Sequence, residues 1–337
     1  MGVHLKKSLI AVAAALLCLA GCGKSEAPAE NGAAKPARVG LVAKSLGNGF
    51  FDAVDKGAQE AARELGAEVI FVGPTTPTAE GQIETLNSLI AQRVDAIAIS
   101  ANDPDALVPT LKKARERGIK VVSYDSAVAQ AARDAHLAPS SDPLIGETVV
   151  ALAAELAPEA KGKFAVVSAT PTSTNQNSWL AEMRRVLPQY PGLELVAVAY
   201  GDDVSDKSYR EAAALLKQYP DLVVLVSISS VGIVASAKAV EDAGLAGKVK
   251  VTGLGLPSEL AGYVQKGVVP KFAIWNPIDL GYSTLQLAVH LARGGTLAQP
   301  VSAGRMGAIS FAADGTGAMS KPFIYDAGNV AEFAKIF

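Results

Sequence analysis

The stretch that decides the fold is residues 38–72, RVGLVAKSLGNGFFDAVDKGAQEAARELGAEVIFV. An apolar run, Val39–Val42, is followed by an amphipathic segment, Phe50–Leu65, and then by a second apolar run, Glu68–Val72. Gly66 stands directly after the amphipathic segment, where a helix commonly ends on a left-handed residue. The order predicts strand, helix, strand. The two strands are expected to be parallel, because parallel neighbours need a crossover of about this length.

The same alternation continues along most of the chain. Further strand-like runs are Ala96–Ser100, Lys120–Tyr124, Phe164–Ser168, Leu195–Tyr200, Val223–Ile228, Val249–Leu254 and Phe272–Trp275. Further helix-like segments are Thr78–Gln92, Pro104–Glu116, Leu144–Leu156, Gln176–Leu187, Lys207–Gln218, Gly232–Ala243 and Leu280–Leu291. So many strands exceed what one small sheet needs. We therefore predict an α/β protein with two similar lobes, each a parallel sheet covered by helices on both faces.

The N-terminus has the pattern of a targeting signal. Residues 1–21 hold two lysines and then an apolar run, Leu9 to Leu19, that is too short to span a bilayer and ends in small residues. This pattern predicts a secretory signal peptide. Leu19-Ala20-Gly21-Cys22 resembles the bacterial lipoprotein box, which implies a mature chain that begins at an acylated Cys22. Ordinary cleavage nearby, with Cys22 unmodified, is the alternative.

Composition restricts the function. Residues 22–37 contain no large apolar side chain and predict a flexible tether. The net charge of -2 supplies no basic field for nucleic acid or for a membrane surface. Removal of the leader leaves Cys22 as the only cysteine, so no intrachain disulfide is expected. Neither His136 nor His290 has neighbours that suggest a metal site or a catalytic triad. We therefore expect no enzyme, no cofactor and no metal.

Candidate site residues follow the predicted strands. Ligands of open parallel sheets bind beyond the carboxyl ends of the strands, so two facing lobes would enclose a cleft lined by these residues. The candidates are Lys44, Phe50, Phe51, Asn102, Asp103, Asp125, Asn175, Gln176, Ser229, Ser230, Trp275 and Asn276. Amides, hydroxyls, an ammonium and carboxylates can bind a polyol, and aromatic faces can pack on a sugar ring. The set predicts a sugar-binding cleft.

Several of these residues have a structural alternative. Either phenylalanine could belong to the core, Lys44 could extend to solvent, and Asp125 could hold a loop. Asn102 and Asp103 could simply cap a helix.

The sequence favours structural roles for two further features. Trp179 lies inside a helical segment and is expected to pack in the interior. Gly201-Asp202-Asp203 with Asp206 lacks the spacing of an EF-hand, so we predict a turn and helix cap there rather than a calcium site.

The chain also resembles a known family. Gly47-Asn48-Gly49-Phe50-Phe51, Ser100-Ala101-Asn102-Asp103-Pro104-Asp105 and Gly201-Asp202-Asp203 are similar to motifs of type I periplasmic sugar-binding proteins of ABC transporters, in the rhamnose-binding and autoinducer-2-binding branch. The resemblance implies two Rossmann-like lobes joined by three crossings, near Ala138, Asn276 and Gly304. Lobe one would comprise 38–138 and 277–304, and lobe two 139–276 and 305–337. It further implies a monomer that serves an inner-membrane permease.

The resemblance also suggests a ligand. In the autoinducer-2 branch the ligand is held by a lysine, an aspartate, an Asp-Gln pair, and backbone at a proline and an alanine. Lys44, Asp125 and Gln176 match, but Asn175 replaces the aspartate of the pair, and Ile228 and Ser230 replace the proline and alanine.

The missing carboxylate removes a strong acceptor, so we favour L-rhamnose or a related deoxysugar. The alternative is a receptor for autoinducer-2 or a chemotaxis signal. An extracytoplasmic α/β enzyme would need a nucleophile or acid–base pair that the strand ends do not supply. We expect a periplasmic protein held to a membrane through Cys22.

Overall fold

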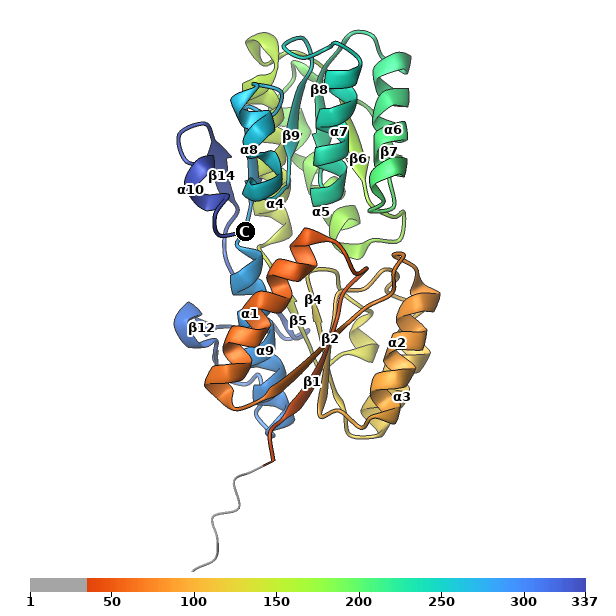
Figure 1. Cartoon of the computed structure of the whole chain (residues 1–337), viewed down its shortest axis with the longest axis vertical. Coiled ribbons are helices and arrows are strands. Elements are labelled where there is room, and N and C mark those ends of the chain that lie inside the picture. The colour runs from red at the N-terminus through yellow and green to blue at the C-terminus, as the bar shows by residue number, and fades with distance from the viewer. Residues whose placement is uncertain (1–34) are drawn as a thin grey trace, which may run out of the picture. The chain divides into compact units, whose positions relative to one another are not determined.

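The computed structural model describes residues 35–337 of the 337-residue chain. The predicted signal peptide, Cys22 and most of the predicted tether lie outside the described residues. Residues 36–337 form one compact unit with two main sheets, which lie one above the other in Figure 1. We use lobe one for the part built around the six-stranded sheet and lobe two for the part built around the four-stranded sheet. No helix within residues 35–337 is long and apolar enough to cross a bilayer.

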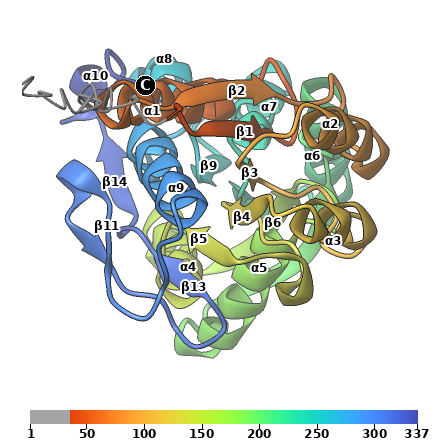
Figure 2. The ribbon, with the colours of Figure 1, turned by 90° about the horizontal axis from the view of Figure 1, so that it is seen from below.

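Lobe one is a parallel sheet with two helices on each face. The strand order is β13-β5-β4-β3-β1-β2, and all neighbouring strands run parallel. Helices α1 and α9 cover one face, and α2 and α3 the other (Figure 2). The strands are β1 (Arg38–Val42), β2 (Glu68–Val72), β3 (Ala96–Ile99), β4 (Lys120–Tyr124), β5 (Ala135–Ala138) and β13 (Thr316–Ala318). The helices are α1 (Gly49–Leu65), α2 (Ala79–Ala91), α3 (Val108–Glu116) and α9 (Pro277–Ala292).

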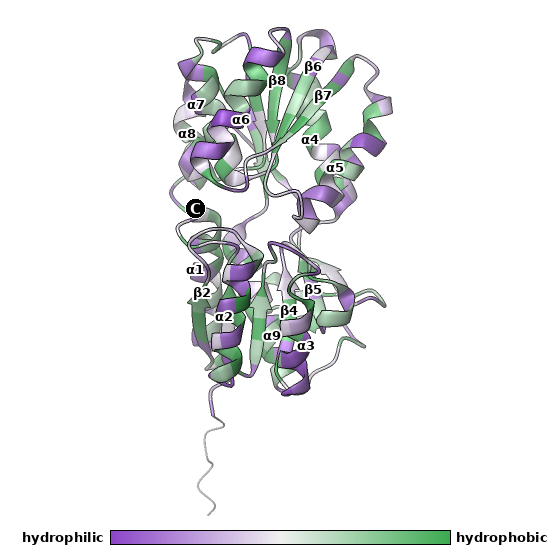
Figure 3. Ribbon diagram, turned by 90° about the vertical axis from the view of Figure 1, so that its right-hand side faces the viewer, coloured by the Kyte–Doolittle hydropathy of each residue, from purple (hydrophilic) through white to green (hydrophobic). Residues whose placement is uncertain are grey.

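Both faces of the lobe-one sheet are buried, which explains the continuous apolar runs of its strands. Val39 and Leu41 of β1 belong to the core under α1 and α9, whereas Ile97 and Ile99 of β3 belong to the core under α2 and α3. Hydrophobic residues accordingly concentrate on the strands, and hydrophilic ones on the outer sides of the helices (Figure 3).

Helices α1 and α9 approach each other closely because each contributes a glycine at the contact. A Cβ on Gly57 would lie 1.7 Å from the carbonyl oxygen of Ile278, and a Cβ on Gly281 would lie 1.8 Å from that of Val54. Neither position can carry a side chain unless the helices move apart. This contact is important for the hinge, because α9 begins directly after the chain leaves lobe two.

Lobe two repeats the architecture on a smaller scale. Its four-stranded parallel sheet has the order β7-β6-β8-β9. Helices α4 and α5 pack together, as do α6 and α7. The strands are β6 (Gly162–Ser168), β7 (Leu193–Tyr200), β8 (Leu222–Ser227) and β9 (Lys250–Gly253). The helices are α4 (Asp142–Leu156), α5 (Thr174–Val186), α6 (Ser205–Gln218), α7 (Ser230–Asp242) and α8 (Pro257–Gln265).

The last part of the chain completes both lobes. Strand β10 (Lys271–Ile274) pairs antiparallel with β14 (Phe323–Asp326) beside β9, and α10 (Val330–Phe333) packs against α8. Strands β11 (Val301–Ser302) and β12 (Ala308–Ile309) form a small antiparallel ribbon.

The chain passes between the lobes three times. It leaves the first sheet after β5 to enter α4, and it returns between β10 and α9. The third crossing follows Ala318, where β13 ends beside β5, and precedes β14. The prediction of a crossing near Gly304 is therefore wrong. Arg305 explains the difference, because its guanidinium binds Glu60 of α1 and Asp279 of α9 and so fixes this segment to lobe one.

The α/β fold with two parallel sheets is confirmed, and each predicted strand and helix is present. The ends of β2 and β4 are those predicted, and the ends of the other elements are shifted. The largest shift is in α3, which begins at Val108 rather than Pro104, because the Asp103 carboxylate accepts the amides of Asp105 and Ala106 in a preceding turn. Strands β5 and β11 to β14 and helices α8 and α10 were not predicted.

Candidate functional site

A cleft lies between the lobes, where the carboxyl ends of the strands of both sheets meet. It encloses about 400 Å³ that no protein atom fills, part of it open to solvent. The lining residues are Lys44, Asn48, Phe50, Phe51, Asp125, Asn175, Gln176, Trp179, Asp203, Ile228, Ser229, Ser230, Leu254, Ile274 and Trp275. Its location is the one expected for a ligand of facing α/β sheets.

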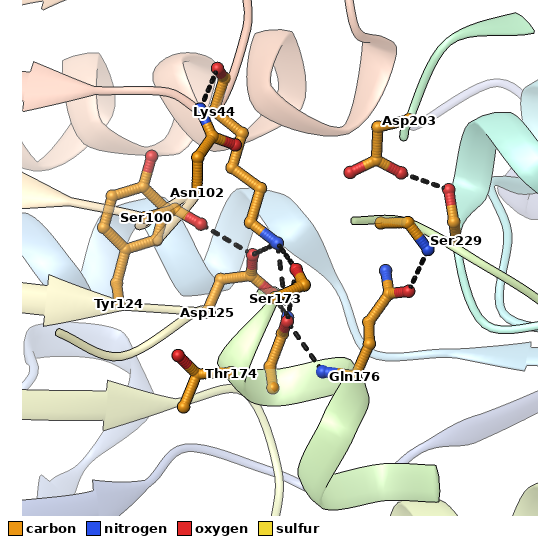
Figure 4. A network of polar contacts seen from close by, with 12 residues as sticks. Lys44, Ser100, Asn102, Tyr124, Asp125, Ser173, Thr174, Gln176, Asp203 and Ser229 are labelled. Atoms are coloured by element: carbon orange, nitrogen blue, oxygen red, sulfur yellow. Dashed lines mark hydrogen bonds and ion pairs between the residues drawn. The ribbon is translucent and has the colours of Figure 1, made fainter. Parts of the chain in front are cut away.

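Asp125 forms the polar centre of the cleft. It follows β4 directly and has a left-handed backbone, with φ of 55°. Its carboxylate accepts a hydrogen bond from the Ser100 hydroxyl at 2.8 Å and one from the Asn175 amide at 2.9 Å. The Lys44 ammonium lies 4.0 Å away. Figure 4 shows Lys44, Ser100 and Asp125 of lobe one meeting Ser173 of lobe two.

Lys44 points into the protein rather than to solvent, with only 4% of its side chain exposed. Its ammonium donates to the Ser173 hydroxyl at 2.7 Å and to Oδ1 of Asn175 at 3.4 Å (Figure 4). Lys44 and Asp125 belong to lobe one, and Ser173 and Asn175 to lobe two. These bonds therefore join the two lobes across the cleft.

Burial and the Lys44 ammonium act on the pKa of the Asp125 carboxyl in opposite directions. Burial raises the pKa of the Asp125 carboxyl; the Lys44 ammonium and the hydrogen bond from Ser100 act in the opposite direction. The nearby Asp203 carboxylate adds to the rise. Burial also raises the pKa of Tyr124 well above its usual value, with the charge on Asp125 as a further cause. The Lys44 ammonium thus favours the ionised form of Asp125, whereas burial favours the protonated form.

Gln176 is oriented by bonds on one side only. Its Oε1 accepts from the Ser168 hydroxyl at 2.7 Å and from the Ala169 amide at 2.6 Å. This fixes the side chain and directs its amide nitrogen toward Asp203 and Ser229 (Figure 4). The amide nitrogen is therefore a positioned donor that faces the cleft.

Aromatic rings form the apolar wall. Phe50 meets Phe51 edge to face at 5.2 Å between centroids, and Trp275 contacts Phe50 at 6.2 Å and Trp179 at 5.5 Å. Trp179 donates its indole N–H to Asp142, and so it both packs, as predicted, and lines the cleft, which was not predicted. The indole N–H of Trp275 is buried and has no partner among residues 35–337.

Nine of the twelve predicted site residues line the cleft, and three do not. The side-chain amide of Asn102 donates a hydrogen bond to the carbonyl oxygen of Lys44 at 2.9 Å, within lobe one. Asp103 holds the turn before α3, and Asn276 caps α9 by accepting the Ile278 amide at 2.9 Å. The side chains of these three residues bond to backbone groups and do not line the cleft. Neither Asn102 nor Asp103 caps α3, which begins after Leu107 with no side-chain cap.

Sequence reasoning missed six lining residues, namely Asn48, Trp179, Asp203, Ile228, Leu254 and Ile274. Asp203 is the most informative omission, because it follows β7 and the strand-end rule covers it. The sequence pattern around Asp203 predicts a turn and a helix cap instead of a site residue. The turn is present, but α6 is preceded by Val204 and has no side-chain cap.

Residues 39–296 match the model of the family described as periplasmic binding protein domain. A solved ABC transporter solute-binding protein from Clostridium phytofermentas, with bound L-rhamnose, is 35% identical, with a TM-score of 0.85, over 90% of this chain and 99% of that one. A D-ribose/D-allose-binding protein of Pseudomonas aeruginosa is 31% identical over 225 residues, which is 64% of this chain and 70% of the relative.

A third similarity concerns the fold alone. A protein from Clostridium saccharobutylicum in complex with autoinducer-2 is 21% identical, with a TM-score of 0.83, over 88% of this chain and 98% of that one.

Together with the two-lobed fold and the cleft, the matches place the chain in the periplasmic binding protein family. Within that family it is a type I sugar-binding protein of an ABC transporter, a class that works outside the cytoplasm.

Proposed function

We propose that this protein captures L-rhamnose or a related 6-deoxysugar and delivers it to an ABC permease. The observation that carries the proposal is the composition of the cleft. Charged and amide groups from both lobes face a wall of aromatic and aliphatic side chains. The L-rhamnose-bound relative, at 35% identity over 90% of this chain, supports the same ligand.

A deoxysugar suits this division of the cleft. The hydroxyls of a sugar ring need donors and acceptors such as Asp125, Gln176 and Ser229, whereas a methyl group needs an apolar surface. Ile228, Leu254 and Ile274 provide that surface. A hydroxymethyl group in the same place would leave a buried hydroxyl unpaired, which costs about 1–3 kcal/mol.

Capture would proceed by hinge closure. Lobe one contributes Lys44 and Asp125, and lobe two contributes Gln176 and Ser229. A sugar that bonds to both sets stabilises the closed arrangement by its higher affinity for that arrangement. The protein acts as a monomer, needs no cofactor and catalyses no reaction on its ligand.

Titration calorimetry with a matched pair of sugars tests the proposal. L-mannose carries a hydroxyl at C6 that L-rhamnose lacks, and the two are otherwise identical. We expect L-rhamnose to bind at least about tenfold more tightly, which corresponds to about 1.4 kcal/mol. D-ribose and D-allose serve as further comparisons. Failure of every sugar to bind at millimolar concentration would refute the proposal.

Autoinducer-2 is the second candidate, because Lys44, Asp125 and Gln176 all line the cleft. The geometry at Asn175 favours a sugar. Its amide donates to Asp125 at 2.9 Å, a bond that an ionised aspartate at the same position could not make. Including autoinducer-2 in the calorimetric panel separates the two candidates.

The proposed location completes the function. An acylated Cys22, which lies outside the described residues, would hold the receptor at a membrane near its permease. One acyl chain binds membranes only marginally, but several hold firmly. A tether of residues 22–37 would then allow capture within tens of ångströms of the membrane surface.

A further inference from the structure

Asp203 occupies an unusual backbone position. It lies in the turn between β7 and α6, and both Asp202 and Asp203 have left-handed backbones, with φ of 55° and 54°. Two consecutive residues other than glycine in this region carry a conformational cost that the surrounding structure must offset. Asp125, the central carboxylate of the cleft, has the same left-handed conformation.

The turn directs its two carboxylates differently. Asp202 forms an ion pair with Lys207 of α6 and does not line the cleft. Asp203 lines the cleft, and one of its oxygens accepts the Ser229 hydroxyl. Ser229 also accepts the Gly232 amide at 3.2 Å as the cap of α7, so the carboxylate is tied to a helix N-terminus.

The other Asp203 oxygen is free to accept a ligand. No group in residues 35–337 donates a hydrogen bond to it, and Figure 4 shows it on the side of the carboxylate that faces Lys44 and Asp125, across an open space from them. The amide nitrogen of Gln176 points toward the same space from below (Figure 4). The lobe-two edge of the cleft thus contains both an acceptor, Asp203, and a donor, the side-chain amide of Gln176.

Asn175, the neighbour of Gln176, does not offer the ligand a carboxylate, and its side chain already bonds within the protein. Its Oδ1 accepts from the Lys44 ammonium and from the backbone N–H of Gln176, and its Nδ2 donates to Asp125. An aspartate at this position would bring two carboxylates within hydrogen-bond distance, where like charges cannot both ionise readily. Among residues 35–337, Asp203 is the one carboxylate that lobe two contributes to the lining of the cleft.

We propose that Asp203 is a ligand-binding residue that determines specificity, by accepting hydrogen bonds from sugar hydroxyls at the edge opposite Asp125. The inference rests on the proposed function and deepens it. Two carboxylates, one from each lobe, would select a ring that carries hydroxyl donors on two opposite edges. A sugar with a hydrogen in place of a hydroxyl at either edge would leave a buried carboxylate oxygen unpaired.

Asp203→Asn tests the inference without a change of shape. Asparagine tolerates the left-handed region, so the fold and the unfolding temperature of the free protein should be retained. The loss of a charged acceptor should weaken binding of L-rhamnose by about tenfold or more in calorimetry. Asp202→Asn is the matched control, because it changes the neighbouring carboxylate outside the cleft. We expect its affinity to stay within about twofold of the parent.

Monodeoxy analogues of L-rhamnose identify the contact. The analogue that lacks the hydroxyl bound by Asp203 should bind the parent and Asp203→Asn with similar affinity, because the interaction is already absent. If the parent binds L-rhamnose and Asp203→Asn binds it equally well, the role of Asp203 is refuted and the proposed function stands. If the parent binds no sugar, the proposed function fails, and the role of Asp203 fails with it.

Discussion

Replacement of Lys44 by methionine would measure how much the attraction between Lys44 and Asp125 contributes to stability. The ammonium lies 4.0 Å from the Asp125 carboxylate, and both side chains are almost fully buried. Two unit charges at this separation interact by about 4 kcal/mol at an effective dielectric constant of 20. Methionine keeps the apolar part of the side chain and removes the charge. We therefore expect Lys44→Met to lower the free energy of unfolding by up to about 4 kcal/mol at neutral pH.

The loss should depend on pH in a defined direction. Burial raises the pKa of Asp125 in the folded protein, and removal of the ammonium raises it further. A carboxyl with a raised folded pKa binds more protons folded than unfolded. Its contribution to stability is present below the unfolded value and is lost as the pH rises through the folded value. The deficit of Lys44→Met should therefore grow as the pH rises from about 4 to about 8.

Urea unfolding across this pH range measures the deficit. Asp125→Asn combined with Lys44→Met is the matched control: it removes both charges and should abolish the pH dependence of the deficit. Ser100 and Asn175 keep partners in that variant, because an amide can both donate and accept. A deficit in Lys44→Met that stays constant with pH would show that the ion pair does not govern the ionisation of Asp125.

Three further changes probe the site, the hinge and the anchor. Asp125→Ala should abolish the thermal stabilisation that sugar confers while the free protein stays folded; an unchanged thermal shift with ligand would contradict the site. Gly57→Ala should cost about 1–3 kcal/mol in urea unfolding, because its Cβ would meet the Ile278 carbonyl at 1.7 Å, whereas Gly262→Ala on α8 has free space and should be neutral or stabilising. Equal stability of the two glycine variants would contradict the packing argument. Cys22→Ser should move the expressed protein from the membrane fraction to the soluble extracytoplasmic fraction; its retention in membranes would contradict acylation.

The sequence predicted those parts of the fold that depend on local patterns. Strand β4 is four consecutive apolar or small residues after Lys120, and its ends were predicted exactly as observed because burial on both faces demands such a run. Strand β13, Thr316–Ala318, has no such signal. It is a strand because β5 lies beside it, and this tertiary pairing also moved the third crossing beyond Gly304.

The same distinction applies to the cleft. The strand-end rule located Lys44 and Asp125, because their position depends only on where a strand stops. It could not distinguish Asn102 from Asn175. The side chain of Asn102 donates a hydrogen bond to the Lys44 carbonyl oxygen, whereas that of Asn175 lines the cleft. That difference depends on distances of a few ångströms between segments far apart in the sequence.

The bonds that already join the lobes decide which residues can discriminate among sugars. Lys44 and Asn175 satisfy each other and Asp125 across the cleft, so a ligand that binds there exchanges one set of hydrogen bonds for another. The net gain from such an exchange is small. The second oxygen of Asp203 accepts no hydrogen bond from residues 35–337, so a hydroxyl placed on it displaces no protein donor. Asp203 should therefore add to the discrimination among sugars that Asp125 provides, whereas the bonds of Lys44 to lobe two set how readily the lobes close.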